Sequence, residues 1–202
     1  MAGRLDMLEK DRVKPMGDFE LEPVRELQPE AVEPMKKEDV VIRMFGASDS
    51  LEALTSLINR AYATLDGGGF RLEGADQSVE RTRQKIDQGA CLVAVLNDAL
   101  VGTLTVRAGF ENPVCAYLAR PDIVCRYQHA VAPEARGRGI GHALMLESER
   151  WARELYFDEI VGYTAEGHAW KRAYWQRNGI VEVDRVQWPG DAFFSVVGAK
   201  RL

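Results

Sequence analysis

The sequence predicts an α/β fold in which helices flank a mixed, mostly antiparallel central sheet. Short runs rich in β-branched residues alternate along the chain with longer segments whose apolar residues recur every three or four positions. A tight-turn signal joins two of the strand-like runs and predicts a hairpin, whereas helix-like segments separate most of the others and predict crossover connections. The expected order of elements is β-α-α-β-β-β-α-β-α-β-β, without an internal repeat.

Length and composition divide the chain into a tail and one domain. Of the 202 residues, 46% are hydrophobic, which suffices for a single core. Residues 1–37 carry four of the eight prolines, many charges and no apolar period. This composition predicts a disordered or loosely docked tail. Met35 would also make an ordinary start just before the first strand, so the authenticity of the tail stays open. Residues 38–202 are the predicted folded domain.

The charge balance excludes some partners. The formal net charge is −5, which disfavours nucleic acid and anionic membrane surfaces as partners. The sequence has no apolar run of about 18 residues or more, and its N-terminal stretch lacks the apolar core of a secretory signal. We therefore expect a cytoplasmic protein without membrane association. The cysteines and histidines show no metal-ligand spacing, so we expect no metal site. They are Cys91, Cys115, Cys125, His129, His142 and His168.

The first elements are a strand and two helices. Val40–Phe45 is short and β-rich, and the Ser48–Ser50 cluster after it is typical of a helix N-cap. Apolar residues at helical spacing predict a helix over Leu51–Leu65, which a triple glycine at residues 67–69 ends. A more polar helix is expected over Ser78–Gln88. The glycine-rich segment Asp66–Gln77 between the helices is either a connector or a substrate-facing lid.

The middle of the chain predicts a hairpin, a third strand and a long helix. Ala90–Leu96 and Ala99–Ala108 flank an Asn-Asp turn and form the hairpin. Ile123–Val131 is the next strand, and a glycine-rich turn then opens a helix over Gly139–Tyr156.

The last third alternates strands with one helix. We expect a strand at Glu159–Ala165, a helix at His168–Arg177 and a strand at Ile180–Gln187. A Pro-Gly turn at residues 189–190 then leads into a final strand at Ala192–Ala199.

The turn before the long helix is the most specific chemical signal. Glycines at 137, 139 and 141 leave backbone N–H groups free to converge on an anion at the positive end of a helix. Arg136 and Arg138 add positive charge, which suggests a pyrophosphate cradle. The alternative is a turn with helix-capping value only. The spacing differs from the dinucleotide-binding G-x-G-x-x-G fingerprint, and no Gly-Lys-Ser/Thr follows as in a Walker loop.

This turn also carries a family resemblance. The stretch Arg136–Gly141, RGRGIG, resembles the R/Q-x-x-G-x-G/A signature of the GNAT acyltransferase superfamily. Val131–Glu134 looks like that family's lead-in, and Tyr174–Ile180 is similar to its late helix-Gly-strand segment. The resemblance covers residues 40–199 and implies a single GNAT-like domain.

The resemblance implies a function and a cofactor. An N-acetyltransferase would move acetyl from acetyl-CoA directly to a primary amine of a small molecule or peptide. The glycine amides would bind the coenzyme A pyrophosphate, and the end of the preceding strand would pair with the pantetheine arm. The oligomeric state is left open, with a homodimer among the alternatives. The implied cofactor-binding residues are Val131, Ala132, Pro133, Arg136, Gly137, Arg138, Gly139, Ile140, Gly141 and His168.

Candidate catalytic residues come first from the strand before the turn. Strict alternation would place Cys125, Tyr127, His129 and Val131 on one face, with Arg126, Gln128 and Ala130 on the other. If the first face meets the acetyl group, as the resemblance implies, His129 and Tyr127 are the best-placed polar groups. An imidazole can accept the ammonium proton near neutral pH, although a buried histidine with a purely structural role is the alternative. The family often has a glutamate near position 127, and its absence leaves Glu73 as a distant candidate base.

The late helix supplies the candidate acid. Relatives often place a tyrosine four residues before the glycine, as proton donor to the departing thiolate. That register falls on Trp175 here, so Tyr174 is the candidate if the helix is rotated or shifted, with solvent as its alternative. Trp175 would otherwise merely pack against the cofactor arm, and a core-facing position for both aromatic residues is a further alternative. Because the glutamate is absent and the tyrosine displaced, a GNAT-like acyl-CoA sensor or assembly module with little catalysis is the alternative function.

Overall fold

The computed structural model describes residues 40–65, 72–109 and 114–202. The expected tail at residues 1–37 lies outside the described residues. So do residues 66–71, which are the first part of the expected connector or lid at Asp66–Gln77 and include the triple glycine.

The predicted α/β fold is confirmed. In the described part of the chain, seven strands form one sheet in the order β1-β2-β3-β4-β5-β7-β6, in which β4 and β5 are parallel and every other neighbouring pair is antiparallel. The strands are β1 (Val40–Met44), β2 (Ala90–Leu96), β3 (Ala99–Ala108), β4 (Ile123–Val131), β5 (Glu159–Ala165), β6 (Val181–Val186) and β7 (Ser195–Arg201). The α-helices are α1 (Leu51–Ala63), α2 (Val79–Ile86), α3 (Ile140–Glu154) and α4 (Ala169–Arg177). Short 3-10 helices are η3 (Glu73–Ala75), η4 (Ala116–Ala119) and η5 (Pro133–Ala135).

Local chemistry explains where the elements begin and end. Ser50 and Ser78 cap α1 and α2, because each hydroxyl accepts a hydrogen bond from a backbone N–H in the first turn. Asn97 and Asp98 both have positive φ, as the two-residue turn between β2 and β3 requires. The last strand starts three residues later than expected, at Ser195, because the residues after Gly190 form a loop beside the site.

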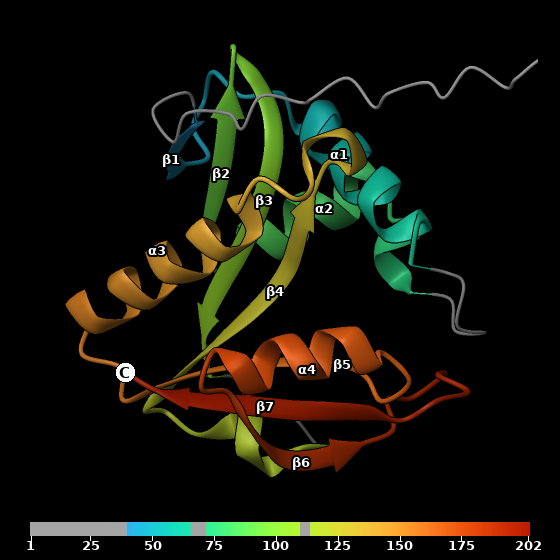
Figure 1. Ribbon diagram of the computed structural model, residues 1–202, viewed down its shortest axis with the longest axis vertical. Helices are drawn as coiled ribbons and strands as arrows, with labels where there is room; N and C mark the ends of the chain where they lie inside the picture. Colours follow the sequence, from blue (N-terminus) through green and yellow to red (C-terminus); the bar gives the residue numbers. More distant parts are fainter. Residues whose placement is uncertain (1–39, 66–71, 110–113) are drawn as a thin grey trace, which may run out of the picture. The chain divides into compact units, whose positions relative to one another are not determined.

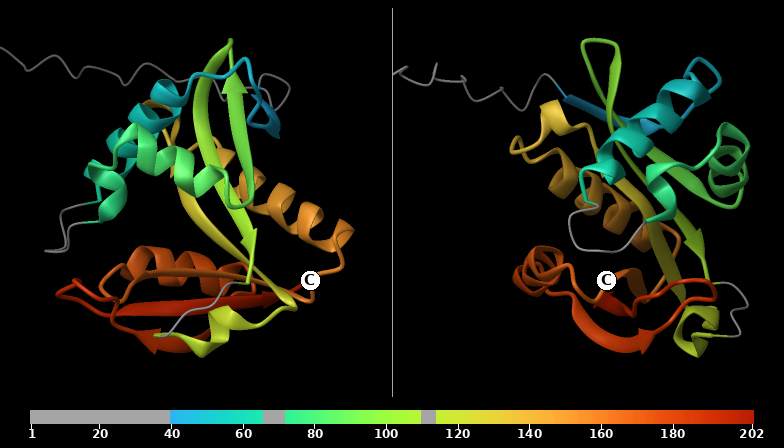
Figure 2. Two further views of the ribbon diagram at one scale, coloured as in Figure 1. Left: turned by 180° about the vertical axis from the view of Figure 1, so that it is seen from behind. Right: turned by 90° about the vertical axis from the view of Figure 1, so that its right-hand side faces the viewer.

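The helices cover both sides of the sheet. In Figures 1 and 2, α3 and α4 lie on one side and α2 lies on the other. Helix α1 packs against α2, where the buried hydroxyl groups of Thr55 and Thr82 are hydrogen-bonded at 2.8 Å. Leu54 and Ile58 of its apolar stripe are fully buried in the main core. None of the helices in the described part of the chain has the length and apolarity to cross a bilayer.

The parallel pair β4 and β5 separates partway along its length. The two strands pair only from Ile123 opposite Glu159 to Arg126 opposite Gly162. Beyond that point β4 continues beside β3 alone and β5 beside β7 alone, and Figure 1 shows β4 turning away from β5. Since a strand directs its backbone groups toward both flanks, this separation leaves one edge of β4 open to a ligand.

Candidate active site

The glycine turn has the backbone conformation that its sequence requires. Gly137 and Gly139 have φ values of +78° and +80°, a region that residues with side chains rarely adopt. A Cβ atom at either position would meet no heavy atom within 4 Å, so the backbone there is open to an approaching ligand. Gly139 is also the N-cap of α3, where unpaired N–H groups favour an anion. The turn therefore suits an anionic group such as a phosphate.

The third glycine also allows close packing. Gly141 lies in the first turn of α3, and a Cβ atom there would come within 3.2 Å of His129 Nε2. Its missing side chain therefore lets α3 approach β4, and the expectation that Gly141 also helps to open the cradle stays a prediction. Ile140 beside it is buried in the core.

The two arginines of the turn, Arg136 and Arg138, have different surroundings. The guanidinium of Arg136 donates to the carbonyl oxygens of Ala61, at 2.8 Å, and Val131, at 3.3 Å. It thus fastens the turn to the end of α1 instead of pointing into the cradle. Arg138 is exposed beside Gly139. Arg60 and Glu134 add a second link between α1 and η5, with their charged atoms 2.9 Å apart.

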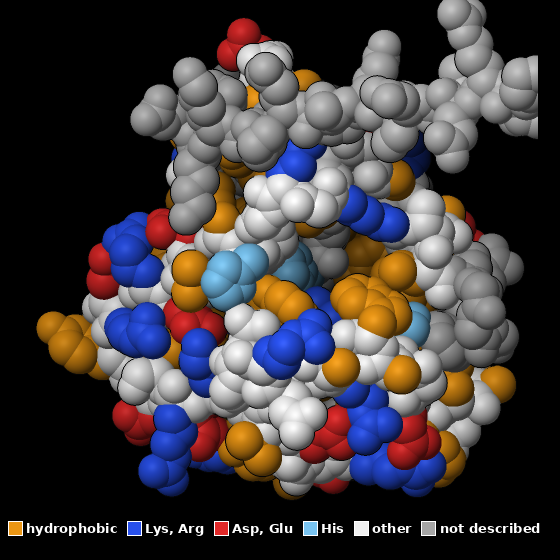
Figure 3. All heavy atoms as spheres, in the orientation of Figure 1, with side chains coloured by type: hydrophobic (Ala, Val, Ile, Leu, Met, Phe, Trp, Pro, Cys, Tyr) orange, Lys and Arg blue, Asp and Glu red, His pale blue; other side chains and the backbone are white. Residues whose placement is uncertain are grey.

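A cavity of about 620 Å³ occupies the gap between β4 and β5. Its wall includes side chains from α1, η3, β4, α3, β5, α4 and the loop between β6 and β7. The face that carries α3 and α4 is hollowed near its middle, where histidine, hydrophobic and basic side chains gather (Figure 3). The lining thus comes from both sides of the sheet.

A bulge in β4 changes which side chains share a face. Gln128 has φ +51°, and the register against β3 shifts between Tyr127 and Ala130. The extra residue interrupts alternation. Arg126, His129 and Val131 consequently face α3 and α4, whereas Tyr127 faces α2, where its hydroxyl donates to Lys85 O at 2.6 Å. The expectation that Tyr127 and His129 share a face is therefore wrong.

His129 is held between two helices. Its Nε2 lies 3.0 Å from the Gly141 carbonyl oxygen in α3, and its Nδ1 lies 3.2 Å from Lys171 Nζ in α4. A carbonyl oxygen only accepts hydrogen bonds, so Nε2 carries the proton and Nδ1 is the acceptor. Burial, together with the positive charges of Lys171 and Arg126, holds the His129 pKa well below its usual 6.5. His129 is therefore neutral at physiological pH.

Two buried cations accompany His129 at the cavity wall. Burial lowers the pKa of Arg126 to about 10, and burial with repulsion from Arg126 lowers that of Lys171 to about 8. Glu149 Oε1 lies 3.8 Å from Arg126 Nη1, but this carboxylate also accepts from Lys200 Nζ at 2.7 and 2.8 Å. Within the described residues, Arg126 Nη1 is buried without a hydrogen-bond acceptor.

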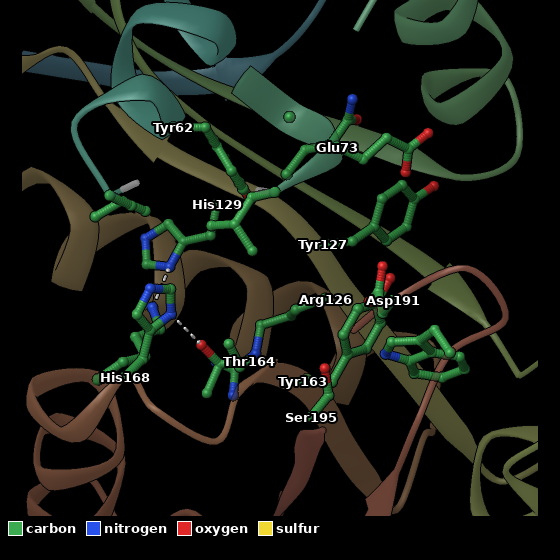
Figure 4. Close-up of a pocket in the computed structure, with 18 of the residues that line it drawn as sticks. Tyr62, Glu73, Arg126, Tyr127, His129, Tyr163, Thr164, His168, Asp191 and Ser195 are labelled. Carbon is green, nitrogen blue, oxygen red and sulfur yellow. Dashed lines mark hydrogen bonds between the residues drawn. The ribbon is translucent and has the colours of Figure 1, made fainter. Parts of the chain in front are cut away.

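The opposite wall is aromatic and acidic. Figure 4 shows Tyr62, Glu73 and Tyr127 above the gap and Tyr163 and Asp191 below it. Burial raises the pKa of Tyr127 to about 12, so its hydroxyl stays protonated. Burial alone would raise the Glu73 pKa, but the ion pairs with Lys85 and Arg81, at 2.9 and 2.6 Å, outweigh it and leave the pKa below its usual value. Burial, with the Glu73 charge second, raises the Asp191 pKa.

The candidate residues of α4 fall in different places. The Tyr174 hydroxyl lies 3.1 Å from His142 Nδ1 on α3, and Tyr174 is not part of the cavity wall. Trp175 is buried and lines the cavity. His168, at the N-cap of α4, also lines it and has its Nδ1 3.0 Å from Thr164 Oγ1 (Figure 4).

Sequence reasoning missed Lys171 and Arg126. A signal for Lys171 was present, because His168, Lys171 and Trp175 follow one another at steps of three and four on one face of α4. A lysine on a helix face that turns toward a sheet is a candidate functional residue. Arg126 gave a similar signal as a charged residue within an otherwise apolar strand segment.

Comparisons with known proteins agree with this geometry. A search of curated proteins finds no significant match. Among solved structures, a GNAT family acetyltransferase from Elizabethkingia anophelis with acetyl-CoA bound is similar with a TM-score of 0.60 and 16% identity, over 82% of this chain and 100% of that one. The PaiA N-acetyltransferase of Thermoplasma acidophilum in complex with coenzyme A gives a TM-score of 0.63 and 17% identity, over 81% and 99%. An IAA acetyltransferase from Bacillus cereus gives a TM-score of 0.57 and 18% identity, over 81% of this chain and 99% of that one.

These similarities show the fold. The model of the acetyltransferase (GNAT) family matches residues 51–180, which include both helices before the hairpin, the glycine turn and α4. The chain belongs to the GNAT acetyltransferase family.

Proposed function

We propose that residues 38–202 form an N-acetyltransferase domain that moves acetyl from acetyl-CoA directly to a primary amine of a small molecule or a peptide. The observation that carries this proposal is the gap between β4 and β5, which holds a cavity lined from both sides of the sheet, beside the strand that runs on into the glycine turn. One side can admit the cofactor arm and the other the acceptor. Acetyl-CoA supplies the activated acetyl group.

The cofactor would be held by backbone more than by side chains. The amides near Gly137 and Gly139 suit the pyrophosphate, helped by the N-terminus of α3. The open edge of β4 up to Val131 suits the amide groups of the pantetheine arm. Ala132 and Pro133 fix the exit from β4, because Ala132 N donates to Val101 O at 2.9 Å and Pro133 begins η5. His168 suits a contact with the arm from α4.

The acceptor would enter from the aromatic wall. Tyr62, Tyr127 and Tyr163 offer π faces, and Asp191 offers a carboxylate, which together suit the cationic form of an amine. Tyr127 would offer its ring to the acceptor, because its hydroxyl is protonated and bound to Lys85 O. His129 remains a candidate base only if its Nδ1 gives up the hydrogen bond with Lys171 Nζ. Tyr174 remains a candidate acid only if its hydroxyl leaves His142.

Turnover with a panel of amines tests the proposal. The purified chain is incubated with acetyl-CoA and with small primary amines or short peptides, while free thiol and acetylated product are measured. We expect thiol release that depends on the acceptor and matches product formation. A Gly139→Asp variant is the negative control, because it places a carboxylate in the cradle. Saturable coenzyme A binding without turnover of any acceptor would instead support the sensor or assembly module. The same assay with amine-free buffer measures background hydrolysis.

A further inference from the structure

Lys171 occupies a position in the cavity that its residue type makes unusual. It lies on the inner face of α4, lines the cavity and directs its ammonium group at His129 on β4. A lysine normally keeps its charge in water, and withdrawing that charge from water costs free energy unless the group is paired. No carboxylate within the described residues forms an ion pair with Lys171. This cost calls for a functional explanation.

The partner of Lys171 orients it without neutralising it. His129 presents the lone pair of Nδ1 to Lys171 Nζ, because its Nε2 proton is committed to the Gly141 carbonyl oxygen. The His129 ring is thus held by its place on β4 and by its hydrogen bond to α3. Its Nδ1 accepts a hydrogen bond from one of the three ammonium protons of Lys171. The other two remain for groups that enter the cavity. Accepting a further proton at Nδ1 would cost His129 this hydrogen bond.

The groups around Lys171 favour loss of its proton. From β4 it meets neutral His129 and the positive charge of Arg126; on α4 it lies near His168 and over the rings of Trp170 and Tyr174. The carboxylate of Glu149, on α3, is engaged with Lys200. Burial and the positive charge of Arg126 lower the Lys171 pKa to about 8. A general acid is most effective when its pKa lies near the pH at which the enzyme works.

We infer that Lys171 is the proton donor to the departing thiolate of coenzyme A, with His129 as the residue that positions it. The inference rests on the proposed acetyl transfer. In the transfer step the amine nitrogen bonds to the acetyl carbon, and the carbon–sulfur bond breaks with its electron pair on sulfur. Sulfur takes a proton from Lys171 Nζ. The acylated nitrogen loses its extra proton to water, and the resulting neutral Lys171 amine is reprotonated from solvent.

The other residues of α4 serve this role less well. Tyr174 is bound to His142 and lies outside the cavity wall. Burial raises its pKa, which makes it a weaker acid. Trp175 carries no titratable proton. Lys171 is the remaining residue of α4 that both faces the cavity and can release a proton near neutral pH.

Three variants test the inference in the full-length protein. Lys171→Met removes the ammonium and keeps an unbranched apolar chain. Lys171→Arg keeps the charge but holds its proton far too tightly to donate it. Arg172→Met is the matched control, because it removes the neighbouring cation of α4, which is exposed and paired with Glu182 at 2.6 Å.

The measurements separate chemistry from folding and binding. For Lys171→Met and Lys171→Arg we expect kcat to fall about 100-fold, the usual scale for loss of an acid catalyst. The affinity for coenzyme A, measured by calorimetry, should stay within about threefold, and the thermal midpoint of Lys171→Met should not fall, since a buried charge is removed. Wild-type kcat should decline as pH rises through about 8, where Lys171 loses its proton, and that decline should be absent in Lys171→Met. Arg172→Met should match the wild type.

Each contrary result has a distinct meaning. Wild-type transfer with unchanged kcat in Lys171→Met overturns the assignment of Lys171 and leaves the proposed function in place. Full activity in Lys171→Arg overturns it as well, because charge alone would then suffice. Coenzyme A binding by the wild type without transfer to any amine overturns both proposals.

Discussion

The two halves of β4 are both β-strand, but the first belongs to the core and the second to the wall of the cavity. From Ile123 to Arg126 the strand is paired on both flanks, and Ile123 and Val124 are fully buried. From Tyr127 to Val131 it is paired only with β3, contains a bulge and lines the cavity. Regular pairing thus builds the core, and the site begins where that pairing stops.

The bulge makes the contrast chemical as well as geometric. In the first half each side chain lies on the face that alternation assigns to it. In the second half the extra residue, Gln128, moves His129 to the side of α3 and α4 and leaves Tyr127 on the other side. A single inserted residue thereby divides two polar groups between the two sides of the sheet.

Ile123→Ala should give the largest loss of stability, and it tests whether the first half of β4 stabilises the fold more than the second. Ile123 is fully buried in a cluster with Val161 and Val197, so the truncation should lower the free energy of unfolding by about 2–5 kcal/mol. Urea unfolding measures this loss. Val131→Ala, in the half-buried second half, should cost less than about 1.5 kcal/mol. Equal losses would contradict the division of β4.

Sequence reasoning predicted the first half of β4 better than the second, for a physical reason. The bounds of β3 and β4 were predicted to the residue, because β-branched runs and turn residues are local signals. The glycine turn was predicted for the same reason, since the residues that adopt positive φ are neighbours in the chain. The bulge left no such signal, because Gln128 is not a residue type that favours positive φ.

Contacts between distant residues account for what the sequence did not predict. Lys171 and His129 are 42 positions apart, and their meeting depends on how α4 packs over the gap between β4 and β5. The orientation of Arg136 likewise depends on a distant contact, because its guanidinium donates to the carbonyl oxygen of Ala61 at the end of α1. Local pattern therefore predicts elements and turns, whereas the orientation of a charged side chain depends on tertiary packing.

Gly139→Asp should separate the cofactor end of the site from the rest. The carboxylate would stand at the positive end of α3 in a backbone conformation that suits glycine, and both effects oppose an anionic ligand. We expect coenzyme A affinity to fall about 100-fold, or about 2.7 kcal/mol. Calorimetric titration measures it. Gly179→Asp is the matched control, because its φ of +74° imposes similar strain outside the cavity wall. An equal loss of affinity there would mean that strain alone is responsible.

His129 should make stability depend on acid pH. Its pKa is well below 6.5 in the folded protein and about 6.5 in the unfolded chain, so below pH 6.5 only the unfolded state binds the proton. The free energy of unfolding should therefore fall as pH drops from 6.5 to 5, by at most about 1.4 kcal/mol per pH unit. Urea unfolding at several pH values measures the slope. His129→Gln should make it shallower, whereas His142→Gln, at an exposed position, should leave it as in the wild type.

Tyr127→Phe should give the smallest effect and tests the consequence of the bulge directly. The Tyr127 hydroxyl donates to Lys85 O and stays protonated, so its removal should cost about 0.5–1.5 kcal/mol of stability through one lost hydrogen bond. Because Tyr127 and His129 lie on different faces of β4, kcat should stay within about threefold of the wild type. Steady-state kinetics and urea unfolding measure the two quantities. A Tyr127→Phe enzyme as impaired as Lys171→Met would mean that the proton passes through the side of α2, and the bulge would then not divide the chemistry.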